Sequence, residues 1–322
     1  MGEGRGKDDE AIYAPTSGEY ISRLLRCDPH PAPPLRTPRN DTVWTSSTVP
    51  KGRGQTNVTI LDAIILGFVQ GASEFLPISS SAHLVITQGL LHINEPSIFL
   101  EVALHVGTLL SVLIYFRRDV IELLNGFFTY LLTSKKTQNE RDFRLSIYIL
   151  LGSIPAAVGG ILLKDWFEQR FDSVSFSGYM LLITAAILLL TWFARNRKHP
   201  VNAIRALIIG VAQFCAILPG ISRSGSTIAA GLFLGITPRE AARFSFLLSL
   251  PAVFGAALLK ATELRHAVFA SDDLIHFALG ACVSFVVGIA AIHYLLKIVS
   301  SRHFYLFGFY CLLAGLFTIL YF

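Results

Sequence analysis

Residues 70–83 read QGASEFLPISSSAH, a polar stretch set inside an apolar one. It follows AIILGFV at 63–69 and precedes LVITQGLL at 84–91, two segments typical of membrane helices. Pro77 lies at its centre and breaks a helix, because proline lacks a backbone donor and clashes with the preceding turn. Irregular backbone at membrane depth persists only where it is buried in protein or lines a watery cavity. The stretch therefore predicts a re-entrant hairpin of two half-helices.

The composition is that of a membrane protein. Of 322 residues, 52% are hydrophobic and 15% are charged, with a mean hydropathy of +0.55, whereas soluble domains carry about 25% charged residues. The net charge is +5, but no basic stripe with interleaved aromatic residues occurs, which argues against a nucleic-acid partner. Residues 1–57 are polar and Pro-rich, so we expect them to be disordered. Because the apolar pattern begins only at Val58, a wrongly assigned start of translation is an alternative explanation of this segment.

Six further apolar runs are long enough to span about 30 Å of hydrocarbon. They cover 98–116, 145–163, 177–194, 244–261, 274–296 and 303–322. A second interrupted run, 204–235, carries LPGISRSGS where the first, 60–91, carries LPISSS. The order is therefore a hairpin followed by three spans, twice, and the predicted fold class is an all-α polytopic membrane protein.

A shift of 143 residues aligns the two halves of this pattern. It places Gly67 on Gly210, and ISSS at 78–81 on ISRS at 221–224. An odd number of spans inverts the second copy, so we expect two inverted-topology repeats, 58–200 and 201–322, as in many transporters. The predicted loops on one side carry most of the Lys and Arg residues, which places that side in the cytoplasm and both termini outside.

The polar residues of the first hairpin fall into two groups. Gln70 and Glu74 stand one helical turn apart on the same face. Ser79–Ser81 begin the second half-helix, where hydroxyls and free N–H groups favour an anion, and His83 follows within the first turn. A carboxylate in a membrane helix costs about 2.5–3.5 kcal/mol, so Glu74 is expected to have a partner or a function.

The second hairpin supplies a cation. Arg223 lies between Ser222 and Ser224 at a predicted helix start, with Thr227 one turn later. A guanidinium is a bidentate donor for phosphate oxygens. If the hairpins meet, Glu74, the serines, His83 and Arg223 surround one cavity suited to metal-assisted phosphoryl transfer.

Structural explanations of the same residues stay open. Serines at a helix break often only cap the helix, and Glu74 could pair with Arg223 simply as a structural bridge. Gln70 could provide an interhelical hydrogen bond. His105 and Glu101 are weaker candidates, expected near the outer membrane interface.

Together, Gln70-x-x-x-Glu74 with FLPISSSAH, and LPGISRSGST, resemble the undecaprenyl-diphosphate phosphatase family, also called the bacitracin-resistance protein family. The resemblance covers about 58–322. It implies a hydrolase in the bacterial inner membrane that removes the terminal phosphate of undecaprenyl diphosphate, with its site open to the outer, periplasmic side. The product is the carrier lipid of peptidoglycan and cell-wall synthesis, and the activity confers bacitracin resistance.

The resemblance also implies roles for individual residues. Glu74 with Gln70 would hold a divalent cation, Mg²⁺ or Ca²⁺. Ser80 is the expected nucleophile, assisted by His83, although the sequence leaves open which of the two attacks. Arg223 would be catalytic. The residues expected to bind the substrate are Ser79, Ser81, Ser222, Ser224 and Thr227.

The sequence also bears on an alternative function and on the oligomeric state. A transporter or flippase of polyprenyl phosphate is the alternative function, because broken helices in inverted repeats serve transport equally well. It differs from the hydrolase in needing no nucleophile. The small residues Gly152, Gly159 and Gly160 allow close helix packing and are compatible with a homodimer.

Overall fold

The computed structural model describes residues 58–93, 98–132, 140–164, 166–167, 173–195, 197–263, 271–301 and 303–322. Every one of them belongs to the same compact unit, 53–322. Residues 1–57 lie outside the described part, so the expectation that they are disordered stays a prediction. Within the described ranges the secondary structure is entirely helical, as the sequence predicts.

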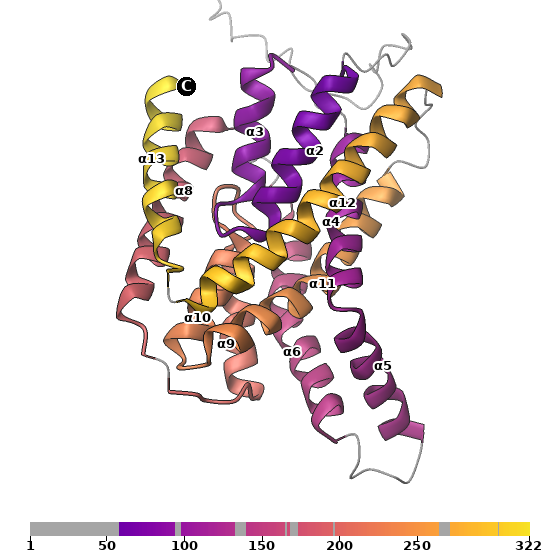
Figure 1. Ribbon diagram of the computed structural model, residues 1–322, viewed down its shortest axis with the longest axis vertical. Coiled ribbons are helices and arrows are strands. Elements are labelled where there is room, and N and C mark those ends of the chain that lie inside the picture. The colour runs from indigo at the N-terminus through magenta and orange to yellow at the C-terminus, as the bar shows by residue number, and fades with distance from the viewer. Residues whose placement is uncertain are drawn as a thin grey trace, which may run out of the picture. The chain divides into compact units, whose positions relative to one another are not determined.

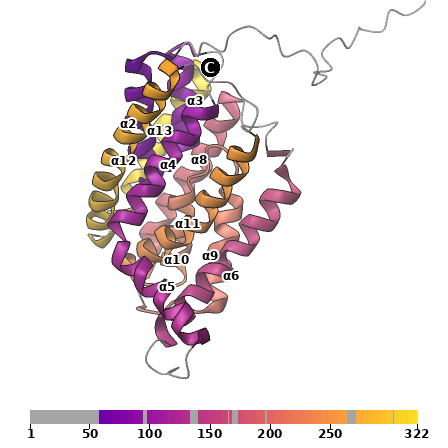
Figure 2. The same ribbon diagram turned by 90° about the vertical axis from the view of Figure 1, so that its right-hand side faces the viewer.

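The helices follow one another in the order shown in Figures 1 and 2. They are α2 (Ile60–Phe75), α3 (Ser80–Leu90), α4 (Ile98–Tyr115), α5 (Arg117–Leu132), α6 (Glu140–Leu162), α8 (Val174–Leu190), the short 3-10 helix η1 (Thr191–Phe193), α9 (Ala203–Cys215), α10 (Arg223–Phe233), α11 (Pro238–Glu263), α12 (Ser271–Ser300) and α13 (Leu306–Tyr321).

Five of the described helices are long and apolar enough to cross a membrane, which makes the chain a multi-pass membrane protein. These segments are Ile98–Tyr115, Glu140–Leu162, Val174–Phe193, Pro238–Leu259 and Leu274–Ser300. They correspond to five of the six expected spans. The sixth, expected at 303–322, is the 16-residue helix α13, about 24 Å long at 1.5 Å per residue and therefore shorter than a typical hydrocarbon core.

Both interrupted runs form two helices joined by a short break, as predicted. The first break lies between α2 and α3 and contains Pro77; the second lies between α9 and α10 and contains Gly220. In Figure 1 the first break lies about midway along the bundle, near the chain that leads into α10. Two contacts join the breaks: the Ser224 hydroxyl donates to the Leu76 carbonyl at 3.2 Å, and the Gly220 amide donates to the Ser81 hydroxyl at 3.4 Å.

Helix α5 was not predicted from the sequence, because residues 117–132 lie between two expected spans, 98–116 and 145–163, where a loop was expected. Its apolar residues recur at helical spacing, and Leu123 is buried against α6. The rings of Tyr130 and Phe143 stack across this pair with centroids 3.9 Å apart. The helix therefore extends the bundle beyond the end of α4, at the lower end in Figure 2.

Glycines allow the hairpins to pack closely against long helices. Helix α2 packs on α12 and α4, and α9 packs on α6. A Cβ on Gly67 would lie 2.6 Å from the Gly280 carbonyl oxygen, so only glycine permits this approach. Gly152 and Gly159 similarly face Ala206 and Phe214 of α9. Gly152 and Gly159 therefore pack against α9 of the same chain, and the homodimer stays a prediction.

Candidate active site

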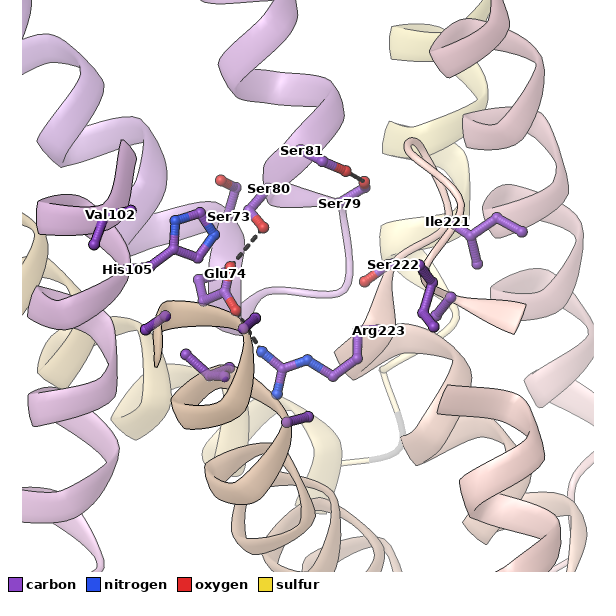
Figure 3. A pocket seen from close by; sticks show the side chains of 16 residues that line it. Ser73, Glu74, Ser79, Ser80, Ser81, Val102, His105, Ile221, Ser222 and Arg223 are labelled. Atoms are coloured by element: carbon purple, nitrogen blue, oxygen red, sulfur yellow. Dashed lines mark hydrogen bonds and ion pairs between the residues drawn. The ribbon is translucent and has the colours of Figure 1, made fainter. Parts of the chain in front are cut away.

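A cavity of about 270 Å³ lies between the two hairpins, walled also by α4 and α11 (Figure 3). Its polar lining comes from Ser73, Glu74, Ser79, Ser80, Ser81, His105, Ser222 and Arg223. Its apolar lining comes from Val102, Ala216, Ile217, Ile221, Ala252, Val253, Ala256 and Ala257. The cavity thus has a polar wall, formed by the two hairpins and His105, and an apolar wall that includes four alanines.

Glu74 is the centre of the polar wall. One carboxylate oxygen, Oε2, accepts from the Ser80 hydroxyl at 2.5 Å and from Gln70 Nε2 at 3.0 Å. The other, Oε1, forms an ion pair with Arg223 Nη2, and Figure 3 shows the carboxylate between the hydroxyl and the guanidinium. The side chains of Glu74 and Arg223 are only 7% and 17% exposed. Each charge therefore offsets the cost of placing the other in a low-dielectric environment.

Arg223 is held at the start of α10. Ser222 caps this helix, its hydroxyl accepting from the Gly225 amide at 3.1 Å. The N-terminus of a helix carries partial positive charge, which adds to the guanidinium. The cationic side of the cavity therefore combines a guanidinium with the positive end of a helix, an arrangement suited to phosphate.

Two of the expected substrate-binding residues do not line the cavity. Ser224 donates to the Leu76 carbonyl, and the Thr227 hydroxyl lies 2.5 Å from the Ser245 hydroxyl and donates to the Arg223 carbonyl at 2.8 Å. Both are buried. The structure places them behind the cavity wall, where they fix the hairpin and the start of α10.

His83 also lies outside the set of residues that line the cavity. Its Nδ1 is 2.8 Å from the Ser79 carbonyl oxygen, and its Nε2 is 2.7 Å from the hydroxyl of Tyr310 on α13. The structure thus brings together Glu74, Ser79–Ser81, Ser222 and Arg223 but not His83. Their catalytic and binding roles stay predictions.

His105, a weaker candidate from the sequence, lines the cavity. It projects from α4 toward Glu74 (Figure 3), and its Nδ1 is 2.8 Å from the Glu101 carbonyl. The signal that could have identified it is its depth: it lies well inside a span that begins at Ile98, and a polar residue at such depth suggests a functional site.

The residues around Glu74 fit a divalent cation with oxygen ligands. Gln70 is fully buried, and its Oε1 has no hydrogen-bond partner in the described structure. An amide oxygen beside a carboxylate is a typical ligand pair for Mg²⁺ or Ca²⁺. Among the described residues, no group of three or more His, Cys, Asp and Glu side chains could enclose a metal. Of the two expected ligands, Glu74 lines the cavity and Gln70 lies behind it, and the cation stays a prediction.

Comparisons with known proteins agree with this geometry. The family described as "Bacitracin resistance protein BacA" matches residues 63–317. A protein of Desulfosudis oleivorans named undecaprenyl-diphosphatase is 41% identical over 274 residues, covering 79% of this chain and 96% of the relative. One of Korarchaeum cryptofilum with the same name is 40% identical over 260 residues, covering 80% and 97%. Undecaprenyl-diphosphatase 1 of Shouchella clausii is 36% identical over 264 residues, covering 80% and 95%. The chain therefore belongs to the bacitracin resistance protein BacA family.

Proposed function

We propose that this protein is an undecaprenyl-diphosphate phosphatase. It hydrolyses undecaprenyl diphosphate to undecaprenyl phosphate and phosphate, which recycles the carrier lipid for cell-wall synthesis and confers bacitracin resistance. The observation that carries the proposal is the Glu74 carboxylate, which accepts from the Ser80 hydroxyl and pairs with Arg223 in one cavity. A hydroxyl, a base and a cation within contact distance are the groups that phosphoryl transfer requires.

In the proposed mechanism Ser80 is the nucleophile. Its Oγ attacks the terminal phosphorus while Glu74 Oε2, already 2.5 Å away, accepts its proton. The bond from that phosphorus to the bridging oxygen breaks, and undecaprenyl phosphate leaves with the electron pair. Water then hydrolyses the phosphoserine, releasing phosphate and restoring the hydroxyl.

Arg223 and the start of α10 stabilise the negative charge of the transferred phosphoryl group. A guanidinium has five N–H donors, so Arg223 can contact phosphate oxygens while it remains near Glu74. Gln70 Oε1 and Glu74 would hold the divalent cation, Mg²⁺ or Ca²⁺, which when bound neutralises charge on the diphosphate oxygens. Ser79, Ser81 and Ser222 line the same wall and would orient the substrate.

The fold is proposed to consist of two inverted repeats, 58–200 and 201–322. Their packing is reciprocal: α2 of the first packs on α12 of the second, and α9 of the second packs on α6 of the first. Likewise α4 packs on α12, and α11 packs on α6. A pseudo-two-fold axis that relates the two repeats would give each contact between them such an equivalent contact.

The cavity lining supports the same symmetry. Positions 143 residues apart line it in pairs from the two hairpins. These pairs are Ser73 with Ala216, Glu74 with Ile217, Ser79 with Ser222, and Ser80 with Arg223. The first repeat thus supplies the base and the nucleophile at positions where the second supplies an apolar residue and the cation.

The proposed location is the bacterial inner membrane, with the re-entrant hairpins meeting at membrane depth and the cavity open to the periplasmic side. The support is the concentration of Lys and Arg in the segments that connect the predicted spans at the opposite end. A site within the membrane suits a substrate whose isoprenoid tail must stay in lipid. A homodimer stays a prediction, which light scattering of the protein in detergent would test.

The transporter alternative receives no support from the relatives, whose names refer to a diphosphatase. A transporter function also does not explain the contact between Ser80 and Glu74, because transport needs binding groups but no nucleophile.

The test is phosphate release from undecaprenyl diphosphate by the purified protein in detergent, with and without a chelator, beside Glu74→Ala and Arg223→Ala. We expect release by the parent that depends on the metal and is lost in both variants. Absence of release from a folded parent would refute the proposed function and direct attention to transport assays in vesicles.

A further inference from the structure

The break of the first hairpin contains a residue in an unfavourable backbone conformation. Ser79 has φ 71°, a left-handed region that residues with a Cβ rarely adopt. The residue at the matched position of the second hairpin, Ser222, has a relaxed φ of −71°, and there the positive φ of 99° falls on Gly220. A hairpin break therefore does not itself require a strained serine, and such strain persists only where surrounding contacts enforce it.

The conformation of Ser79 determines where the next hydroxyl points. Ser79 precedes α3 without capping it through its side chain, and its hydroxyl instead lies 3.2 Å from that of Ser81. Ser80, the first residue of α3, then turns its hydroxyl back to Glu74, six residues earlier. A relaxed Ser79 would rotate the start of α3 and move the Ser80 hydroxyl away from this carboxylate.

His83 holds the Ser79 carbonyl from inside α3. Both the His83 backbone amide, at 3.2 Å, and the ring nitrogen Nδ1, at 2.8 Å, contact that oxygen. A carbonyl oxygen only accepts, so Nδ1 carries a hydrogen. In the neutral ring Nε2 is then an acceptor, and the Tyr310 hydroxyl at 2.7 Å donates to it. The two rings also stack, with centroids 5.6 Å apart and an angle of 16°.

We propose that Tyr310 is a positioning residue of the active site and that it acts through His83. By donating to Nε2 it fixes the ring of His83, the ring holds the carbonyl of Ser79 in its strained conformation, and Ser80 stays directed at Glu74. His83 then works as a structural link from α13 to the nucleophile, and takes no part in bond making. The inference rests on the proposed function, because it assigns Ser80 as the attacking group.

The second hairpin provides an internal comparison. The position that matches His83 is Ser226, and its buried hydroxyl has no hydrogen-bond partner among the described residues. Its backbone amide still donates to the Ser222 carbonyl at 2.9 Å. The imidazole link is thus added only to the hairpin that has a strained serine and carries the proposed nucleophile.

Variants of His83 separate a positioning role from a chemical one. Asn places its Nδ2 where His places Nδ1, so His83→Asn can keep the bond to the Ser79 carbonyl, while Gln instead mimics Nε2. We expect His83→Asn to retain kcat within about tenfold of the parent, and His83→Ala and His83→Gln to lose about a hundredfold or more. Equal loss in all three would overturn the positioning role.

Tyr310→Phe keeps the stacked ring and removes only the hydroxyl. We expect kcat for undecaprenyl diphosphate to fall about three- to tenfold with KM unchanged. In the His83→Asn background, which lacks the Nε2 acceptor of the Tyr310 hydroxyl, we expect Tyr310→Phe to cause no further fall in kcat. Tyr179→Phe on α8 is the matched control, because this tyrosine is 54% exposed. Unchanged kcat in Tyr310→Phe, or additive losses in the double variant, would overturn the proposal.

An NMR measurement that does not depend on activity separates this test from the test of the proposed function. In the ¹⁵N-histidine spectrum of the parent in detergent, we expect the signal lost in His83→Asn to show the Nδ1–H tautomer, and Tyr310→Phe to shift its Nε2 resonance. An Nε2–H tautomer would refute the link. An inactive parent that shows both spectral features would refute the phosphatase and leave the link intact.

Discussion

The pairing of Glu74 with Arg223 makes a quantitative prediction about stability. Glu74→Gln keeps the shape of the side chain and removes its charge, which leaves a guanidinium that is 17% exposed without its counter-ion. Arg223→Gln has the converse effect on a carboxylate that is 7% exposed. Loss of one partner from a buried pair costs about 3–5 kcal/mol, because the remaining charge is uncompensated.

The double variant Glu74→Gln, Arg223→Gln contains no charge at either position. Two amides can hydrogen-bond to each other, to Gln70 and to Ser80, so the double variant should lose only about 1–2 kcal/mol. For a chain of this size each kcal/mol corresponds to roughly 2–4 °C in Tm. We therefore expect each single variant to melt about 10 °C below the parent, and the double variant to melt above both.

Thermal unfolding in detergent and phosphate release on the same samples provide the assay. The proposed mechanism needs both charges, so release should be absent in all three variants even where Tm recovers. A double variant that melts at the sum of the two single shifts would show that the charges do not compensate each other. Recovery of activity together with Tm would show that the pair is only a structural bridge.

Three further predictions concern the nucleophile, the metal and the packing of α2. Ser80→Ala should lower kcat about a thousandfold or more while Tm falls by only a few degrees, because one hydrogen bond to Glu74 is lost, whereas Ser153→Ala on α6 should retain activity. Gln70→Glu adds a second carboxylate and should lower the Mg²⁺ concentration for half-maximal activity roughly tenfold; an unchanged requirement would argue against a ligand at this position. Gly67→Ala should cost about 1–3 kcal/mol, seen as a lower Tm, because its Cβ would meet the Gly280 carbonyl at 2.6 Å. Gly255→Ala, which meets nothing within 4 Å, should melt at or above the parent temperature.

The sequence predicts those features of the fold that depend on local chemistry. Pro77 and Gly220 break apolar runs that would otherwise continue as helices, so both hairpins follow from the sequence. The contact between Glu74 and Arg223 follows from the cost of an isolated charge in a membrane. Each residue supplies the opposite charge that the other needs.

What the sequence does not predict depends on rotation about helix axes and on packing between distant segments. The face on which His105 lies is decided by the packing of α4 against the hairpin and α12, so its depth in the span could suggest a functional residue but not that its side chain lines the cavity. Thr227 resembles a phosphate ligand in its motif, but its position one turn into α10 directs the hydroxyl back at the Arg223 carbonyl. Tyr310 is 227 residues from His83, and no local pattern connects the two.

The division of the site between the hairpins has a consequence for assembly. Glu74 belongs to the first hairpin and Arg223 to the second, and either charge alone in hydrocarbon is unfavourable by a few kcal/mol. Each hairpin is therefore poorly accommodated until the other arrives, and the ion pair that forms then also completes the cavity. The same contact thus stabilises the assembled bundle and positions the groups for phosphoryl transfer. A chain whose halves fail to meet would carry an unpaired charge in the membrane, so the energetics favour only the arrangement in which the site is complete.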